Sequence, residues 1–213
     1  MAQTMIFVLA MLAIISMVEV FAAPSQDLSP VIPETHTHGD MEFKGTIHGV
    51  DFQANGTVES IYAQFTKQHP NVVASFNADH LPVGTGQSNG NNSALVARNK
   101  ILPPNCAACG AWGWVAAETD TINDGVNYLI HHAGTCGVGP RSCVRISCSY
   151  SAAIYLCNDN YYGIAPSCVY LASYAKDLTN DCSFWDAGAN WTCGQEFDTD
   201  AYNVIVHYDD HNC

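Results

Sequence analysis

The sequence predicts a small, disulfide-rich α+β sandwich with a mainly antiparallel sheet and two helices. The first observation behind this prediction is that all ten cysteines lie between Cys106 and Cys213, a density typical of disulfide scaffolds. The second is that hydrophobic residues in this stretch switch between the period of a strand and that of a helix, in the order β-α-β-β-α-β. We therefore divide the chain into residues 1–22, 23–100 and 101–213.

Residues 1–22 are expected to be a signal peptide. The apolar run from Met5 to Met17 is shorter than the roughly 20 residues that a membrane span needs. Val20-Phe21-Ala22 then offers the small residues that signal peptidase reads. Because Met1 to Thr4 carries no Lys or Arg, an uncleaved anchor is the alternative. We expect the mature chain to be secreted, to lack a membrane span and to form its disulfides in an oxidising compartment.

Residues 23–100 are expected to be a Cys-free extension or pro-segment. The apolar residues from Val58 to Phe65 have the spacing of a helical stripe. The run from Gly84 to Ser93 has the composition of a flexible linker. No Lys-Arg pair marks a processing site, so the sequence leaves open whether this segment is removed.

In residues 101–213, the first expected element is a short strand at Trp112-Gly113-Trp114-Val115. A helix follows, capped by Thr119 or Thr121. Its apolar stripe runs from Ile122 to Ala133, and Gly134 is the residue expected to end it.

Two strands come next, from Ser142 to Ser149 and from Ala153 to Cys157. By period two, Val144, Ile146 and Cys148 are expected to lie on one face of the first strand. A clean alternation from Tyr202 to Tyr208 predicts the last strand of the chain.

Between these strands, a second helix is predicted from the apolar stripe between Cys168 and Cys182, with Pro166 in its first turn. An intact helix holds these two cysteines about 21 Å apart along its axis. They cannot bond to each other, so each is expected to tether a different end of the helix to the sheet or to a loop.

All the cysteines are expected to pair into five bridges, and their spacing does not assign the connectivity. Cys106 and Cys109 form a C-x-x-C, which makes a zinc site the alternative, but no second pair of similar spacing follows. We therefore expect no metal and no cofactor. The residues expected in disulfides are Cys106, Cys109, Cys136, Cys143, Cys148, Cys157, Cys168, Cys182, Cys193 and Cys213.

The charge of the chain excludes two classes of partner. Its formal net charge is −13, and from Cys106 onward it has twelve acidic residues against three basic ones. Such a surface repels phosphate backbones and anionic lipid. We therefore expect no binding to nucleic acid and no docking of a basic surface on a membrane.

The order of elements, the cysteine content and the terminal strand together resemble the killer toxins of the KP-four type, small secreted fungal proteins with an α/β sandwich. Related folds occur among fungal necrosis-inducing effectors. The resemblance covers about half the chain and implies this fold and a toxin or effector role. The type member is thought to act on calcium channels through basic residues, which are scarce here, so the resemblance does not imply that target. The residues that carry it are Cys148, Cys157, the helix between Cys168 and Cys182, Cys193, Gly194-Gln195, Asn203 to Val206 and Asn212-Cys213.

Exposed aromatic and basic side chains form the expected binding surface. Tyr161, Tyr162 and Trp185 lie in predicted loops, where their rings are available to a partner. Arg141 and Arg145 flank the central hairpin and are further candidates.

Three N-x-S/T triplets, at Asn55, Asn91 and Asn190, predict N-glycosylation, as in a secreted eukaryotic protein.

No catalytic residues are assigned. Asp159, Asp198 and Asp200 lie in turns beside strands, but no recognisable spacing pairs them for acid–base catalysis. The segment from His207 to His211 contains two imidazoles and two carboxylates that could gather a divalent cation, although such tails are usually solvated.

We therefore expect a secreted, disulfide-bonded effector or toxin that binds an extracellular protein or a cell-wall or cell-surface target, and that is not an enzyme. An extracellular hydrolase and a wall-polysaccharide-binding protein are the alternatives.

Overall fold

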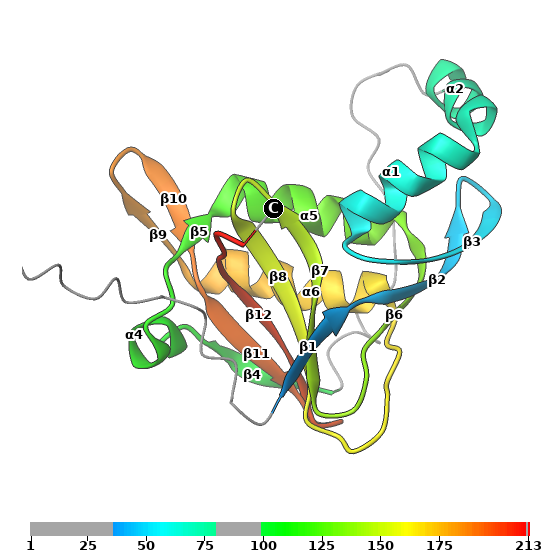
Figure 1. Cartoon of the computed structure of the whole chain (residues 1–213). Helices are drawn as coiled ribbons and strands as arrows, with labels where there is room; N and C mark the ends of the chain where they lie inside the picture. Colours follow the sequence, from blue (N-terminus) through cyan, green and yellow to red (C-terminus); the bar gives the residue numbers. More distant parts are fainter. Residues whose placement is uncertain (1–35, 80–98, 212) are drawn as a thin grey trace, which may run out of the picture.

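The computed structural model describes residues 36–79, 99–211 and 213, and a six-stranded sheet is its central feature (Figure 1). The strands lie in the order β1-β7-β8-β12-β11-β4. Every neighbouring pair is antiparallel except β1 and β7. The strands are β1 (Thr37–Asp40), β4 (Lys100–Asn105), β7 (Ser142–Ser149), β8 (Ala152–Asn158), β11 (Gly194–Asp198) and β12 (Tyr202–Tyr208).

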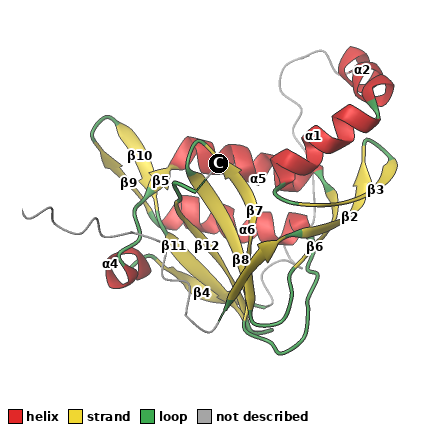
Figure 2. Cartoon of the chain, in the orientation of Figure 1, coloured by secondary structure: helices red, strands yellow, loops and turns green. Residues whose placement is uncertain are grey.

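Helices α5 (Thr119–His131) and α6 (Cys168–Asp181) pack side by side across one face of this sheet (Figure 2). Both buried faces follow the apolar stripes in the sequence, so the expected α+β class, the mainly antiparallel sheet and the two helices are confirmed. Helix α1 (Val58–Gln68) packs against α5 and β7. Two further helices are α2 (Pro70–Asp79) and α4 (Ala108–Trp112).

Two three-stranded sheets complete the fold. One has the order β3-β2-β6 and the other the order β5-β10-β9. Their strands are β2 (Glu42–Ile47), β3 (Val50–Asn55), β5 (Ala117–Glu118), β6 (Ala133–Gly137), β9 (Ser183–Asp186) and β10 (Ala189–Thr192).

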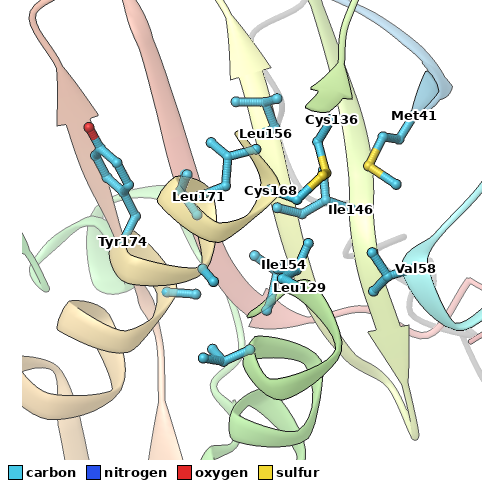
Figure 3. Close-up of a cluster of buried hydrophobic side chains, with 14 of the residues drawn as sticks. Met41, Val58, Leu129, Cys136, Ile146, Ile154, Leu156, Cys168, Leu171 and Tyr174 are labelled. Atoms are coloured by element: carbon cyan, nitrogen blue, oxygen red, sulfur yellow. A yellow bond between two sulfur atoms is a disulfide. The ribbon is translucent and has the colours of Figure 1, made fainter. Parts of the chain in front are cut away.

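The described part of the Cys-free segment shares one hydrophobic core with the Cys-rich part. Strand β1 pairs with β7, and β2 pairs with β6. Met41 and Val58 are fully buried in the same cluster as Ile146 and the Cys136–Cys168 disulfide, and Figure 3 shows them together. Residues 36–79 are thus held to the rest of the chain by backbone pairing and apolar burial, without a disulfide.

The central sheet is buried on both faces. Its inner face, toward α5 and α6, carries Ile154 and Leu156 against Leu129 and Leu171 (Figure 3). Its outer face carries a smaller cluster with Trp114 packed against it. That outer cluster consists of Cys143, Cys148, Ala153, Tyr155, Cys157 and Ile205.

All ten cysteines are paired, which confirms the five expected bridges. Cys168 bonds to Cys136 in β6, and Cys182 bonds to Cys106 just after β4. The two ends of α6 are therefore tied to different strands, as its length required. The other bridges are Cys109–Cys193, Cys143–Cys157 and Cys148–Cys213.

The expectation that Cys148 shares a face with Val144 and Ile146 is wrong. The register between β7 and β8 shifts between Arg145 and Ser147, so Ile146 is an extra residue, as in a β-bulge. Beyond the bulge the alternation reverses. Cys148 therefore lies on the outer face, where it can bond to Cys213.

Four local expectations also fail. The N-cap of α5 is Glu118, so neither Thr119 nor Thr121 caps this helix. Trp112 ends a helix rather than forming a strand, and Gly113 closes that helix in a left-handed conformation. Pro166 precedes α6, whose N-cap is Ser167. Helix α5 ends at His131, whereas Gly134 lies in β6 opposite Gly45. A Cβ at Gly134 would meet the Lys44 carbonyl oxygen at 2.6 Å, so this glycine permits close strand pairing.

Candidate functional site

A groove of about 970 Å³ lies between α1, α5 and two β-turns. We call it the α1–α5 groove. Its size is typical of sites for small molecules or short oligomers. Its lining residues are Thr46, Ile47, His48, Gly49, Glu59, Tyr62, Asp124, Asn127, Tyr128, His131, His132, Ala133, Ser149 and Tyr150.

Helix α5 supplies one wall through its polar face. Asp124, Tyr128 and His131 follow the i, i+4, i+7 spacing, so they lie along one side of the helix. The opposite side carries the buried stripe that packs on the sheet. Burial of that stripe therefore fixes which side chains of α5 reach the groove.

Two tight hairpin turns supply the rims. His48 and Gly49 join β2 to β3 with φ of 50° and 78°, and Tyr150 and Ser151 join β7 to β8 with φ of 46° and 62°. Two consecutive left-handed residues are typical of the two-residue turns that connect twisted strands. Because the Tyr150 side chain is 92% exposed, its ring is available at the rim.

Contacts between α1 and β7 hold Glu59, one of the lining residues, in place. The Glu59 carboxylate accepts a hydrogen bond from the Ser147 hydroxyl and one of 3.1 Å from the backbone N–H of Cys148. Gly125 of α5 lies directly over Ser147, and a Cβ there would approach its hydroxyl oxygen to 2.2 Å. The helix can therefore come this close to the strand only with glycine at that position.

An aromatic and histidine cluster lines the apolar part of the groove. The ring of Tyr62 stands edge-to-face with that of His132, with centroids 5.7 Å apart, and tilts against Tyr128 at 6.1 Å. The Tyr62 hydroxyl lies 3.2 Å from Nε2 of His48. These contacts hold Tyr62 in one orientation between the two helices.

His132 is the most unusual residue of the groove. It is only 3% exposed, and its Nδ1 is hydrogen-bonded to the carbonyl oxygen of Tyr128. Burial lowers the pKa of the imidazole, against the raising effect of that hydrogen bond. Its other nitrogen, Nε2, is buried and has no hydrogen-bond partner among the described residues. A buried polar atom of this kind is rare in native proteins.

The aromatic residues predicted from sequence to bind a target lie outside this groove. Tyr161, Tyr162 and Trp185 are all exposed. Tyr161 and Tyr162 lie between β8 and α6, whereas Trp185 lies in strand β9 rather than in the loop that the sequence had indicated. Figure 1 shows these two regions at opposite ends of the molecule. The three rings are therefore not brought into one surface.

The two predicted arginines are engaged in local contacts. Arg141 lies 3.7 Å from the carboxylate of Asp159 and over the ring of Tyr161. Arg145 pairs with Asp209 at 3.1 Å. Both therefore help to hold loops beside the sheet.

The structure separates the residues of the C-terminal acidic segment: His207 is buried in β12, whereas Asp209, Asp210 and His211 follow that strand. Nδ1 of His207 is hydrogen-bonded to the carbonyl oxygen of Tyr208, and its buried ring is stacked 5.2 Å from that of Tyr155. Asp209, Asp210 and His211 place possible ligand atoms within 4.8 Å of one another. The Asp209 carboxylate accepts hydrogen bonds from Tyr155 and Arg145. Burial acts to raise its pKa, but the hydrogen bonds from Tyr155 and His211 and the charge of Arg145 together lower it.

The turn acids and the sequons have separate positions. Asp198 is buried and accepts hydrogen bonds from Tyr174 and Tyr170, so it organises the end of β11. Asn55 and Asn190 are exposed at strand positions, whereas Asn91 and residues 1–22 lie outside the described part of the chain.

Comparisons with known proteins give no match. No family model, no curated protein and no solved structure is significantly similar to the chain. Among the described helices, none combines the length and apolar character needed to cross a membrane.

Sequence reasoning missed the groove as a site. Its residues come from four separate segments around His48, Tyr62, Tyr128 and Tyr150. The available signals were the adjacent histidines His131-His132 and the polar side of α5. Neither signal indicates that α1 and two turns converge on the same place.

Proposed function

We propose that this chain is a secreted, disulfide-bonded effector or toxin-like protein that acts by binding an extracellular or cell-surface target. The α1–α5 groove is its binding surface. The observation that carries this proposal is the concavity itself, which is lined by aromatic rings and a few polar side chains, as binding sites typically are.

Secretion is supported by the five disulfides and by the apolar N-terminal run that reads as a signal peptide. A role as an effector or toxin is supported by the likeness of the element order and cysteine content to killer toxins of the KP-four type. Because the chain has a net charge of −13, it would be repelled by an anionic target, so a neutral or positively charged target surface is favoured.

The experiment is a binding assay with fluorescently labelled protein on intact fungal and plant cells and on their isolated walls. Tyr150→Ala removes an exposed ring from the rim of the groove. Tyr161→Ala is the matched control, because that ring is 86% exposed and lies elsewhere. We expect Tyr150→Ala to weaken binding by about tenfold or more, a loss within the range found for aromatic side chains that contact a partner, while Tyr161→Ala binds as the wild type does.

Equal binding by the wild type and Tyr150→Ala, together with loss in Tyr161→Ala or Trp185→Ala, would move the binding surface to the loops predicted from sequence. Absence of binding to every cell and wall preparation would contradict the proposal.

A further inference from the structure

The hairpin of β9 and β10 brings the Asn190 sequon and Trp185 to the same face. Asn190 of β10 is paired with Trp185 of β9. Side chains of directly opposite residues in an antiparallel pair lie on one face and are neighbours. The adjacent pair, Phe184 and Trp191, lies on the other face, because successive side chains of a strand alternate. Trp185 is therefore the aromatic residue of this hairpin that shares a face with Asn190.

The turn of the hairpin makes this pair a close one. Ala187 and Gly188 have φ of 48° and 90°, as in a two-residue type I′ turn, so the residues that flank the turn exchange hydrogen bonds. Hydrogen-bonded and non-hydrogen-bonded pairs alternate along an antiparallel ladder, so Trp185 and Asn190 form the second kind, in which side chains lie closer. Their Cβ atoms are expected roughly 4.5–5.5 Å apart.

Both members of the pair face solvent. Asn190 is exposed, and Trp185, which is 69% exposed, is the most exposed of the four tryptophans of the chain. Figure 1 shows β9 and β10 projecting from the rest of the molecule, so there is space beside them for a bulky group. A large apolar ring thus lies open to solvent next to an asparagine that a glycosyltransferase can recognise.

The third residue of the sequon shows when a sugar can be attached. Thr192 is 0% exposed, and its hydroxyl lies 2.7 Å from that of Thr119 and 2.6 Å from that of Ser183. An enzyme that reads Asn-x-Thr can reach this hydroxyl only before β9, β10 and α5 have assembled. In the transfer step, Nδ2 of Asn190 bonds to the anomeric carbon of N-acetylglucosamine in a lipid diphosphate-linked oligosaccharide. The bond from that carbon to the diphosphate breaks, the diphosphate leaves with the electron pair, and the amide loses one proton.

We propose that Asn190 carries an N-linked glycan whose first N-acetylglucosamine packs on the indole ring of Trp185. The axial C–H groups of this β-linked sugar form an apolar, slightly positive face, which matches the negative face of an aromatic ring. The contact stabilises the hairpin and covers Trp185, so this ring is not free to bind a target. The inference rests on the secretion that is part of the proposed function, and it is independent of the α1–α5 groove.

The first test locates the sugar. The full chain is expressed in yeast, purified from the medium and treated with endoglycosidase H, which leaves one N-acetylglucosamine at each modified asparagine. Peptide mass mapping is expected to find this sugar on Asn190. The ring current of an indole shifts protons above its face upfield. We therefore expect the C–H proton signals of this sugar to lie upfield of their positions in Trp185→Ala, as measured by NMR.

Thermal unfolding gives an independent readout. Asn190→Gln, which carries no sugar at this position, is expected to melt about 2–4 °C below the wild type, the shift that one aromatic contact gives in a chain of this size. In the Trp185→Ala background, the same change is expected to leave the melting temperature unaltered. Phe184→Ala is the matched control, because Phe184 is an exposed aromatic residue of the same strand on the opposite face. In that background Asn190→Gln should lower the melting temperature as it does in the wild type.

The outcomes separate this inference from the proposed function. A secreted protein without sugar on Asn190 would overturn the inference and leave the proposed function intact. So would sugar protons that are not shifted by Trp185, or a stabilising effect of the sugar that persists in Trp185→Ala. Failure of the chain to be secreted would contradict the proposed function together with the inference.

Discussion

The Glu59 carboxylate accepts a hydrogen bond from the Ser147 hydroxyl, although the two residues belong to the Cys-free and Cys-rich parts of the chain. Ser147 reaches the helix side of β7 because of the bulge at Ile146. The second Glu59 oxygen accepts a hydrogen bond from the N–H of Cys148. One carboxylate thus joins α1 to the strand that also carries a disulfide.

We expect Glu59→Ala and Ser147→Ala each to lower the free energy of unfolding by about 1–3 kcal/mol, because each leaves a partly buried polar partner unsatisfied. The double variant is expected to lose less than the sum, since both changes remove the same bond. Urea titration measures all of these values. Asp51→Ala, at an exposed position of β3, is the control and should stay within about 0.5 kcal/mol of the wild type. Additive losses would show that the bond contributes nothing.

Substitution of Gly125 tests how closely α5 packs on β7. Glycine in a helix interior usually costs about 1 kcal/mol relative to alanine, so propensity alone predicts that Gly125→Ala stabilises the protein. We expect the reverse, because the new Cβ would lie 2.2 Å from Ser147 Oγ and 3.2 Å from Ile154 Cδ1. Gly110→Ala is the matched control: Gly110 lies in the short helix α4 and a Cβ there meets nothing within 4 Å. Thermal unfolding of the wild type and both variants measures the effect. A melting temperature of Gly125→Ala above that of the wild type would contradict this packing.

Because of Glu196, the free energy of unfolding is expected to depend on pH. Glu196 is 0% exposed, and neither carboxyl oxygen has a hydrogen-bond partner among the described residues. Burial raises its pKa from 4.5 to about 8, opposed by Lys100 at 4.0 Å. In the unfolded chain the group ionises near its ordinary pKa. Its contribution to stability is therefore complete below pH 4.5 and is lost as the pH rises through about 8.

Glu196→Gln removes this titration and keeps the shape of the side chain. We expect the variant to gain stability relative to the wild type as the pH increases from 5 to 8, at up to about 1.4 kcal/mol per pH unit. Urea titrations at both ends of this range measure the difference, in which all groups shared by the two proteins cancel. A constant difference would mean that Glu196 is already ionised when buried.

Tyr150 is expected to stabilise binding at the expense of folding. Its φ of 46° places a bulky residue in the left-handed region, which costs about 1–2 kcal/mol relative to glycine. Since the ring is almost fully exposed, Tyr150→Gly should raise the free energy of unfolding by about 1 kcal/mol while lowering binding to cells or isolated walls. Tyr161→Gly, at an exposed position without positive φ, should lose about 0.4–1 kcal/mol. A destabilised Tyr150→Gly would show that the ring makes contacts that hold the turn.

Much of the fold could be predicted because particular residues carry strong local signals. The separation of Cys168 and Cys182 required different partners, and the structure provides Cys136 and Cys106. The alternation from Tyr202 to Tyr208 gave the last strand with its bounds. Single residues with tertiary roles were harder: Ile146 forms a bulge inside a regular pattern, and Gly134 serves strand pairing instead of a helix end.

The groove could not be predicted for the same reason. Tyr62 looks like one more member of an apolar stripe, and Tyr150 like an ordinary turn residue. Only the contact of α1 with α5 brings Tyr62 to His132. Whether His132 Nε2 has a hydrogen-bond partner depends on the residues that folding brings around it, so the pattern of hydrophobic residues in the sequence cannot predict it.

The position of β12 has a consequence for the order of events during synthesis. It is the last strand in the sequence, yet it lies in the middle of the central sheet, between β8 and β11. The earlier strands form two groups, β1-β7-β8 and β11-β4, that share no backbone pairing until β12 enters between them. Until residues 202–208 have been synthesised and have joined the sheet, β8 and β11 therefore each keep an unpaired edge, and the sheet closes only when this strand enters.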